Sequence, residues 1–131
     1  MRLLLDTQAW LWMQAASKRL GTQARDLITS PTTELLLSAV SSWEIAIKYR
    51  LGKLPLPTAP DRYVPSRMRS SGVEPLPIMH AHALRVAELP DHHGDPFDRL
   101  LIAQAQLDGL TILTSDRMFA RYDVTVRWTT D

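Results

Sequence analysis

The sequence contains no cysteine. It therefore has neither a disulfide framework nor a thiolate metal site, and this composition fits the reducing cytoplasm, where we expect the protein to be. Long apolar runs are also missing, because the longest span only a few residues and a membrane helix needs roughly 20. The apolar stretch 1–12 is interrupted by Asp6 and Gln8, and no small-residue cleavage site follows it. We expect neither a membrane segment nor a signal peptide.

A large excess of charge of either sign is absent too. The 15 basic and 14 acidic residues give a formal net charge of +1, so the distribution of charge says more about a nucleic-acid partner than its total. The 131 residues show no internal repeat, low-complexity segment or linker. A chain of this length can bury one substantial core, and we expect a single domain over residues 1–131.

Short apolar segments alternate with amphipathic ones along the chain. The predicted strands cover residues 2–5, 35–37, 73–76, 110–113 and, as an edge strand, 124–128. The predicted helices cover residues 9–16, 22–29, 39–50, 61–70 and 78–88, with a helical turn at 117–122. This alternation predicts an α/β domain with a largely parallel central sheet, whose strands are apolar because both faces are buried.

The stretch 95–116 carries the clearest local signals. Asp95 suits the N-cap of a helix, Pro96 suits its first position, and Gly109 suits the position after its last turn. The apolar residues 110–113 that follow predict a buried strand. Together these signals predict a capped helix, a glycine turn and a strand.

Two acidic residues lie on faces that should be apolar. In the helix that follows Asp95, Asp98 aligns with Leu101, Ile102 and Ala105 at helical spacing. In the helix predicted over 39–50, Glu44 aligns in the same way with three apolar residues, namely Val40, Trp43 and Ile47. An acid in such a stripe either stabilises its own helix or belongs to a site.

Four acids are predicted to meet at one edge of the sheet. Asp6 follows the first strand, Asp116 follows the strand at 110–113, and Glu44 and Asp98 lie near the starts of helices that can pack over the same edge. Sites of open parallel sheets lie at the carboxyl ends of the strands. Clustered carboxylates repel one another unless a cation neutralises them, and an all-oxygen ligand set suits Mg²⁺ or Mn²⁺. The chemistry that this favours is metal-assisted phosphodiester hydrolysis.

Each acid also has a purely structural interpretation. Asp6 and Asp116 could cap helices, and Asp98 could interact with the dipole of its own helix. Ser41 and Glu44 match a capping box, in which the glutamate reaches back to the backbone of the cap residue. Taken one at a time, the structural and functional interpretations are both open. Independent caps, however, have no reason to gather at one edge.

A basic segment lies between residues 45 and 73. It holds six basic residues against the single acid Asp61, and these are Lys48, Arg50, Lys53, Arg62, Arg67 and Arg69. They could gather an RNA backbone near the acids, or form a solvated helix face, and Lys48 could simply pair with Glu44. Arg99 could contact phosphate or a neighbouring carboxylate.

Two further groups of side chains leave alternatives open. His92 and His93 lack the spacing of metal ligands on a helix and could make substrate or second-shell contacts. The tryptophans at positions 10, 12 and 43 are more typical of a core or a dimer surface than of base stacking.

The four acidic segments together resemble the PIN domain, and in particular the VapC-type toxins of bacterial and archaeal toxin–antitoxin pairs. The resemblance is carried by residues 3–7, 38–48, 95–105 and 113–116, and it extends over essentially the whole chain. It implies a three-layer α/β/α fold and a Mg²⁺- or Mn²⁺-dependent endoribonuclease that acts as the toxin of a type II module.

The resemblance also assigns roles to residues at matching positions. The acidic quartet would be Asp6, Glu44, Asp98 and Asp116. Asp6, Asp98 and Asp116 would be the metal ligands, and Glu44 would activate water or support the ligands without binding the ion itself. Thr7, Thr114 and Ser115 would line the site, whereas Asp95 would only cap its helix.

The partners that the resemblance implies are a cognate antitoxin, an RNA substrate such as a tRNA, and a second copy of the chain. Operator DNA would be bound only through the antitoxin. Two alternatives differ in class. A PIN fold without catalysis would be a binding module. A phosphatase-like phosphoryl-transfer domain would need a second aspartate two residues after Asp6, where this chain has Gln8.

Overall fold

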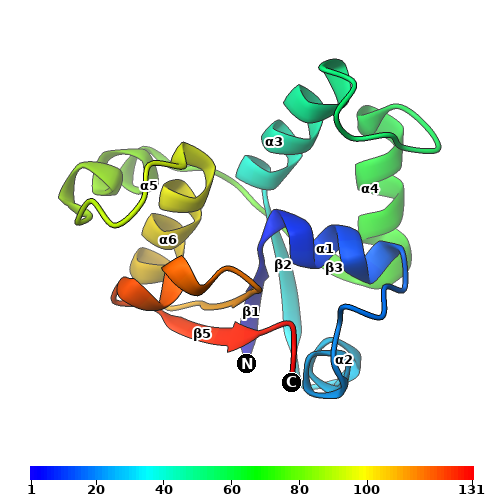
Figure 1. The fold of residues 1–131 in the computed structure, drawn as a ribbon, viewed down its shortest axis with the longest axis horizontal. Helices are drawn as coiled ribbons and strands as arrows, with labels where there is room; N and C mark the ends of the chain where they lie inside the picture. The colour runs from blue at the N-terminus through cyan, green and yellow to red at the C-terminus, as the bar shows by residue number, and fades with distance from the viewer.

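A five-stranded sheet with the strand order β3-β2-β1-β4-β5 forms the centre of the protein (Figure 1). The computed structural model describes all residues from 1 to 131. The strands are β1 (Arg2–Leu5), β2 (Glu34–Ser38), β3 (Val73–Leu76), β4 (Thr111–Thr114) and β5 (Thr125–Trp128). All four pairings are parallel, as the apolar strands predicted.

Helices cover both faces of the sheet. They are α1 (Thr7–Gln14), α2 (Thr22–Thr29), α3 (Ala39–Arg50), α4 (Pro60–Ser71), α5 (His80–Arg85) and α6 (Pro96–Asp108), with the 3₁₀ helices η1 (Val86–Glu88) and η2 (Arg117–Arg121). None of them combines the length and the apolar composition that crossing a membrane requires. The alternation of helices and strands therefore matches the predicted α/β class.

The alternating direction of strand side chains divides the interior into two cores. Leu3 and Leu5 of β1 point to one face and pack with residues of α1, α2, α3 and α4. Leu4 points to the other face and packs with residues of α3, α6 and η2. Two cores on the two faces of one sheet make the three-layer α/β/α arrangement that was predicted.

The register of the sheet aligns the strand ends that matter for function. Leu5 at the end of β1 pairs with Leu37 of β2 and with Leu113 of β4. The residues that follow the three central strands therefore reach the same edge. Asp6 is one of them, and its position fits the sequence prediction.

The caps of α6 form as predicted. Asp95 is the N-cap and accepts hydrogen bonds from the backbone of the first turn, and Pro96 is the first helical residue. Gly109 ends the helix in the left-handed conformation at φ 66°, which costs a residue without a Cβ very little. These local signals fix where the helix begins, and hence that Asp98 lies in its first turn.

The apolar stripe predicted for α3 is wrong. Trp43 is 54% exposed and Ile47 is 36% exposed. The buried residues of this helix are Val40, Ser41, Glu44 and Ile45. The helix is thus rotated by about one residue relative to the prediction, since its buried face is chosen by its packing on the sheet and not by hydropathy alone. Glu44 stays on the buried face in either case.

The helix predicted over 78–88 is also shorter than expected. It begins at His80 and continues into the 3₁₀ helix η1. The backbone N–H of Met79 donates to His82 Nδ1 at 3.0 Å, so a side chain satisfies the first turn.

Candidate active site

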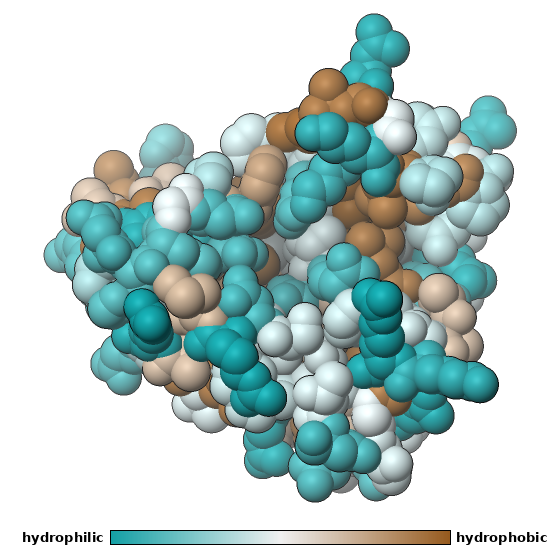
Figure 2. Space-filling view, viewed as in Figure 1, coloured by the Kyte–Doolittle hydropathy of each residue, from teal (hydrophilic) through white to brown (hydrophobic).

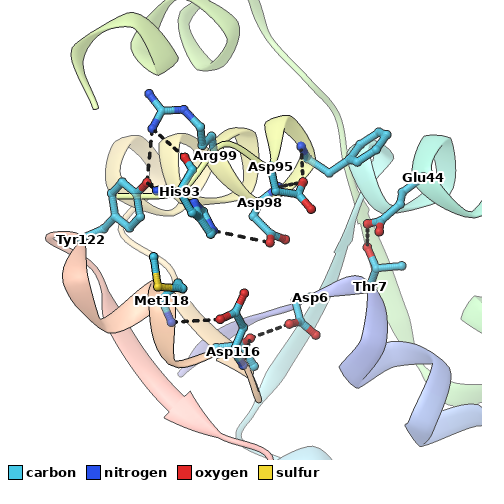
Figure 3. A network of polar contacts seen from close by, with 12 residues as sticks. Asp6, Thr7, Glu44, His93, Asp95, Asp98, Arg99, Asp116, Met118 and Tyr122 are labelled. Atoms are coloured by element: carbon cyan, nitrogen blue, oxygen red, sulfur yellow. Dashed lines mark hydrogen bonds and ion pairs between the residues drawn. The ribbon is translucent and has the colours of Figure 1, made fainter. Parts of the chain in front are cut away.

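The structure brings the four predicted acids to one cavity at the edge of the sheet (Figure 3). Asp6 follows β1, Asp116 follows β4, Glu44 lies on α3 and Asp98 lies in the first turn of α6. This acidic cavity has a volume of about 410 Å³. Its lining consists of Asp6, Thr7, Gln8, Leu11, Glu44, Lys48, Lys53, Leu54, Asp95, Asp98, Ser115 and Asp116. Figure 2 shows the hollow between the α6 side and the α3 side of the molecule.

Asp6 is held by two hydrogen bonds and is almost fully buried. Its Oδ1 accepts from the backbone N–H of Ala9 at 2.7 Å, which caps α1. Its Oδ2 accepts from Thr114 Oγ1 at 2.5 Å. Burial, with smaller contributions from the charges of Glu44 and Asp116, raises its pKa to about 6 although both hydrogen bonds favour the charged form. Capping and membership of the cluster therefore occur together.

Asp98 is the most perturbed acid of the cavity. Burial raises its pKa to about 8, and the nearby charges of Asp95, Asp6, Glu44 and Asp116 add to the effect. Without a cation the ionised form of this carboxyl group is therefore disfavoured. A bound divalent cation would reverse that preference, because it would supply the positive charge that the cluster lacks.

Asp116 and Asp95 both cap helices at the rim of the acidic cavity. Asp116 Oδ1 accepts from the backbone N–H of Met118 at 2.9 Å at the start of η2. Asp95 Oδ1 accepts from the backbone N–H groups of Phe97 at 2.9 Å and Asp98 at 3.1 Å. In each case a second carboxylate oxygen remains without a hydrogen bond from the protein. Asp95 also lines the cavity, which the sequence interpretation did not anticipate.

The capping-box interpretation of Glu44 is wrong. The N-cap of α3 is Ser38, and the Glu44 carboxylate does not reach back to the backbone at Ser41. Its Oε1 instead accepts from Thr7 Oγ1 at 2.7 Å, and its Oε2 pairs with Lys48 Nζ. Glu44 is therefore anchored between α1 and its own helix, with its carboxylate at the cavity.

This fold and cluster can be compared with known proteins. The sequence profile described as the PIN domain matches residues 3–124. This chain belongs to the PIN domain family.

One curated relative is similar in sequence to part of this chain, and two solved structures are similar in fold. Ribonuclease VapC16 of Mycobacterium tuberculosis (strain ATCC 25618 / H37Rv) is 52% identical to this PIN domain over 60 residues. That match spans 46% of this chain and only 43% of the relative. VapBC2 from Rickettsia felis, crystallised with a DNA fragment from its promoter, superposes with a TM-score of 0.71 at 14% identity over 98% of both chains. VapBC-1 from nontypeable Haemophilus influenzae gives a TM-score of 0.66 at 16% identity over 100% of both chains.

The remaining predicted site residues of this PIN domain differ in whether they reach the acidic cavity. Thr7 and Ser115 line the acidic cavity. Thr114 is fully buried behind Asp6 and reaches the cavity only through its hydrogen bond to that carboxylate. Arg99 points away from the cavity (Figure 3).

Arg99 has a structural task instead. Its guanidinium donates to the backbone carbonyls of Pro90 at 2.8 Å, Val86 at 3.2 Å and Leu89 at 3.3 Å. It also donates to Tyr122 Oη at 3.2 Å. These contacts tie the loop before α6 to the helix, so the phosphate contact suggested for Arg99 has no geometric support.

The six basic residues of the segment 45–73 do not form one surface at the site. Lys48 and Lys53 line the acidic cavity. Arg67 donates to the backbone carbonyl of Gln14 at 3.1 Å, and its guanidinium lies over the Tyr63 ring. Arg50, Arg62 and Arg69 are exposed but do not line the cavity.

The sequence left open whether His92 or His93 lies near the site. His93 Nε2 lies 3.6 Å from Asp98 Oδ2, whereas His92 packs its ring against Tyr122. The adjacency of both histidines to the α6 motif was the only available signal, and it did not distinguish one from the other.

Proposed function

We propose that this PIN domain is a metal-dependent endoribonuclease of the VapC type, acting in the cytoplasm as the toxin of a type II toxin–antitoxin module. The observation that carries the proposal is the convergence of four acids from four distant segments on one cavity. The name of the M. tuberculosis relative, a ribonuclease, supports the reaction and the substrate class.

The residues of the acidic cavity fit Mg²⁺ or Mn²⁺. Their donors are carboxylate and hydroxyl oxygens, which hard divalent cations prefer. Burial, and to a smaller extent the neighbouring carboxylates, raise the pKa values of Asp6 and Asp98, and a bound cation would offset both effects by stabilising the ionised forms. Asp6, Asp98 and Asp116 would hold the ion. When bound, it would activate a water molecule and offset charge on the scissile phosphate.

The protein's own groups would orient the ligands and the water. Thr114 holds Asp6 Oδ2, and the start of α1 holds Oδ1, so this carboxylate is fixed before any ligand arrives. Thr7 and Lys48 hold Glu44 on two sides. A carboxylate held in this way would position the attacking water or accept a proton from it, as the family resemblance implies.

Lys48 and Lys53 would contact the RNA backbone. Both line the acidic cavity, so their ammonium groups can attract phosphates to a centre that is otherwise negative. We restrict the predicted RNA contacts to these two lysines, because Arg67 and Arg69 do not line the acidic cavity. Lys48 also pairs with Glu44, which leaves its other N–H groups for phosphate.

A separate groove supports an antitoxin partner. It lies between α3, α4 and β3, has a volume of about 750 Å³, and includes the apolar residues Ala46, Val64, Met68 and Val73. We name it the α3–α4 groove. Two of the solved neighbours are described as VapBC bound to DNA, which suits an antitoxin that brings operator DNA. A homodimer is expected from the resemblance.

Purified protein freed of any antitoxin tests the nuclease. Total RNA should be cut when Mg²⁺ or Mn²⁺ is present and left intact after chelation. Asp98→Asn should abolish cutting, whereas the matched control Asp91→Asn, on an exposed side chain seven residues earlier, should leave it unchanged. Cleavage that survives chelation or persists in Asp98→Asn would exclude a metal nuclease. RNA binding without cleavage would favour a binding module.

A further inference from the structure

His93 approaches the acidic cavity from behind Asp98. Its Nε2 lies 3.6 Å from Asp98 Oδ2, and this buried nitrogen has no hydrogen-bond partner within normal distance. Nε2 and one oxygen each of Asp98 and Asp116 lie within 4.8 Å of one another. The histidine does not itself line the cavity. A group of this kind is either a metal ligand or a hydrogen-bond donor, and the two differ in where the ring carries its proton.

The hydrogen bonding of the other ring nitrogen, Nδ1, distinguishes a metal ligand from a hydrogen-bond donor. Tyr122 Oη lies 3.2 Å from His93 Nδ1, 3.2 Å from the backbone nitrogen of His93 and 3.2 Å from Arg99 Nη1. The backbone N–H and the guanidinium have only hydrogens to offer, so they occupy both lone pairs of the phenol oxygen. The phenol hydrogen remains, and it has His93 Nδ1 as its acceptor.

With Nδ1 accepting, the neutral ring carries its hydrogen on Nε2. That hydrogen faces Asp98 Oδ2, and the ring is held by the aromatic neighbours Phe119 and Tyr122. Ligation of a cation by Nε2 would need a lone pair there and would move the hydrogen to Nδ1, toward a phenol oxygen that already accepts two hydrogen bonds. The arrangement therefore favours a donor over a ligand.

We propose that His93 is a positioning residue for Asp98: Tyr122 fixes its ring in the donating tautomer, so that Nε2–H faces the Asp98 carboxylate at 3.6 Å and closes to a hydrogen bond when that carboxylate binds a cation. The proposal rests on the proposed metal site, in which Asp98 is a ligand. Partners that orient a ligand in this way raise metal affinity by roughly 10–100-fold in known sites. His93 would act on the cation only through Asp98.

Two substitutions separate donation from packing. Gln in His93→Gln can place an amide N–H near the former Nε2, whereas His93→Leu keeps bulk and removes the donor. His92→Leu is the matched control, because His92 contacts the Tyr122 ring edge-on with centroids 4.9 Å apart and has no polar contact with the acids. Thermal unfolding of all three variants confirms that each is folded.

Calorimetric titration with Mn²⁺ alone, without RNA, measures the effect. His93→Leu should weaken Mn²⁺ binding by roughly 10-fold or more, His93→Gln should restore most of the loss, and His92→Leu should stay within about twofold of the parent. Wild-type affinity in His93→Leu would overturn the proposal. Equal losses in the Gln and Leu variants would do the same, because they would indicate packing and not donation.

Nitrogen NMR of ¹⁵N-histidine-labelled protein reads the tautomer directly. His93 should show a protonated Nε2 and an unprotonated Nδ1, both before and after Mg²⁺ is added, and Tyr122→Phe should release this preference. A Mg²⁺-bound protein whose His93 Nε2 has lost its hydrogen would show a direct ligand instead. These readouts use no RNA, so a protein that binds Mn²⁺ but does not cut RNA would contradict the proposed function and leave this inference intact.

Discussion

Ser38 Oγ donates a 2.6 Å hydrogen bond to Gln104 Oε1, and both side chains are fully buried. Ser38 caps α3, which carries Glu44, and Gln104 lies in the middle of α6, which carries Asp98. The same hydroxyl also accepts from the backbone N–H of Val40 at 3.0 Å. One buried polar contact therefore ties together the two helices whose acids face each other across the cavity.

Loss of this contact should destabilise the whole domain. Gln104→Leu would leave the Ser38 hydroxyl without its acceptor and the Pro77 carbonyl without the amide that reaches it at 3.2 Å. Burial of such unsatisfied groups costs about 1–3 kcal/mol. Denaturant unfolding should show this loss, and Gln23→Leu, at an exposed position of α2, should change stability by less than about 0.5 kcal/mol. Equal effects at both positions would contradict the role of the contact.

Stability of the cation-free protein should fall as pH rises. The pKa of Asp98 is about 8 in the folded state and near 3.8 in an unfolded chain, so between these values the folded protein binds more protons. Unfolding free energy then decreases with pH, and most of the loss is complete above pH 8. Thermal unfolding in a chelator between pH 5 and pH 8.5 measures it.

Asp98→Asn should remove most of this pH dependence. At pH 5 the carboxyl group is neutral in the folded parent but already largely ionised in the unfolded chain, so the variant should be more stable by about 1–2 kcal/mol. Between pH 5 and pH 8 this difference should grow by about 1.4 kcal/mol per pH unit. A variant that is less stable at pH 8 would show that the negative charge is compensated without a cation.

Substitutions of Asp95 can separate the effect of helix capping from the effect of its negative charge on Asp98. Asp95→Asn keeps an N-cap oxygen and removes the charge that helps to raise the pKa of Asp98. The pKa of Asp98 in the folded state should fall, so the pH-dependent loss of stability should be smaller and should end at a lower pH, while RNA cleavage should persist. Asp95→Ala should cost about 1 kcal/mol in addition, because the hydrogen bonds to the first turn of α6 are lost. Carbon-detected NMR of the aspartate carboxyl groups would follow the titration, and an unchanged Asp98 curve would contradict the charge argument.

Lys53 should matter more for RNA binding than Arg62. Lys53 lines the acidic cavity and Arg62 does not. Lys53→Gln should lower RNA affinity several-fold and reduce the slope of log affinity against log salt by about 0.7, as expected for one lost contact to single-stranded RNA. Arg62→Gln is the control. Fluorescence anisotropy at several salt concentrations, with Asp98→Asn as the background to prevent cleavage, distinguishes the two. Equal effects of the two substitutions on RNA affinity would indicate that RNA binds to a general basic surface instead.

The α3–α4 groove should be where an antitoxin binds. Ala46 is exposed and lines this groove, so Ala46→Arg should place a charged side chain in an apolar surface and weaken co-purification with an antitoxin at least 10-fold. Ala87→Arg, exposed on η1 and outside the groove, should have no effect. The nuclease activity of the free Ala46→Arg variant should equal that of the parent. Unchanged antitoxin binding by this variant would show that the antitoxin binds outside the groove.

Local signals in the sequence were sufficient to predict the order of helices and strands and the positions of the four acids. The cap Asp95 and the turn at Gly109 act within one helix, so they placed α6 to the residue, and the helix predicted over 39–50 has the same bounds as α3. The parallel order of strands then brought Asp6 and Asp116 to one edge. The family resemblance added the same four acids independently.

What the sequence could not predict depends on contacts between distant segments. The buried face of α3 follows from how the helix crosses the sheet, which exposes Trp43 in place of Ser41. The pair formed by Ser38 and Gln104 joins residues 66 positions apart, and no local pattern marks it. Arg99 looked like a site residue because it follows Asp98, yet helical geometry turns it toward the preceding loop.

The hydrogen bond between Thr114 and Asp6 spans 108 residues, and β1 pairs with β4 across the same interval. A growing chain on the ribosome therefore lacks one neighbour of its central strand, and Asp116 as well, until β4 and the residues after it have been synthesised. Cutting the chain before residue 111 would remove Asp116 from the acidic cavity and leave Asp6 Oδ2 without the hydroxyl that holds it.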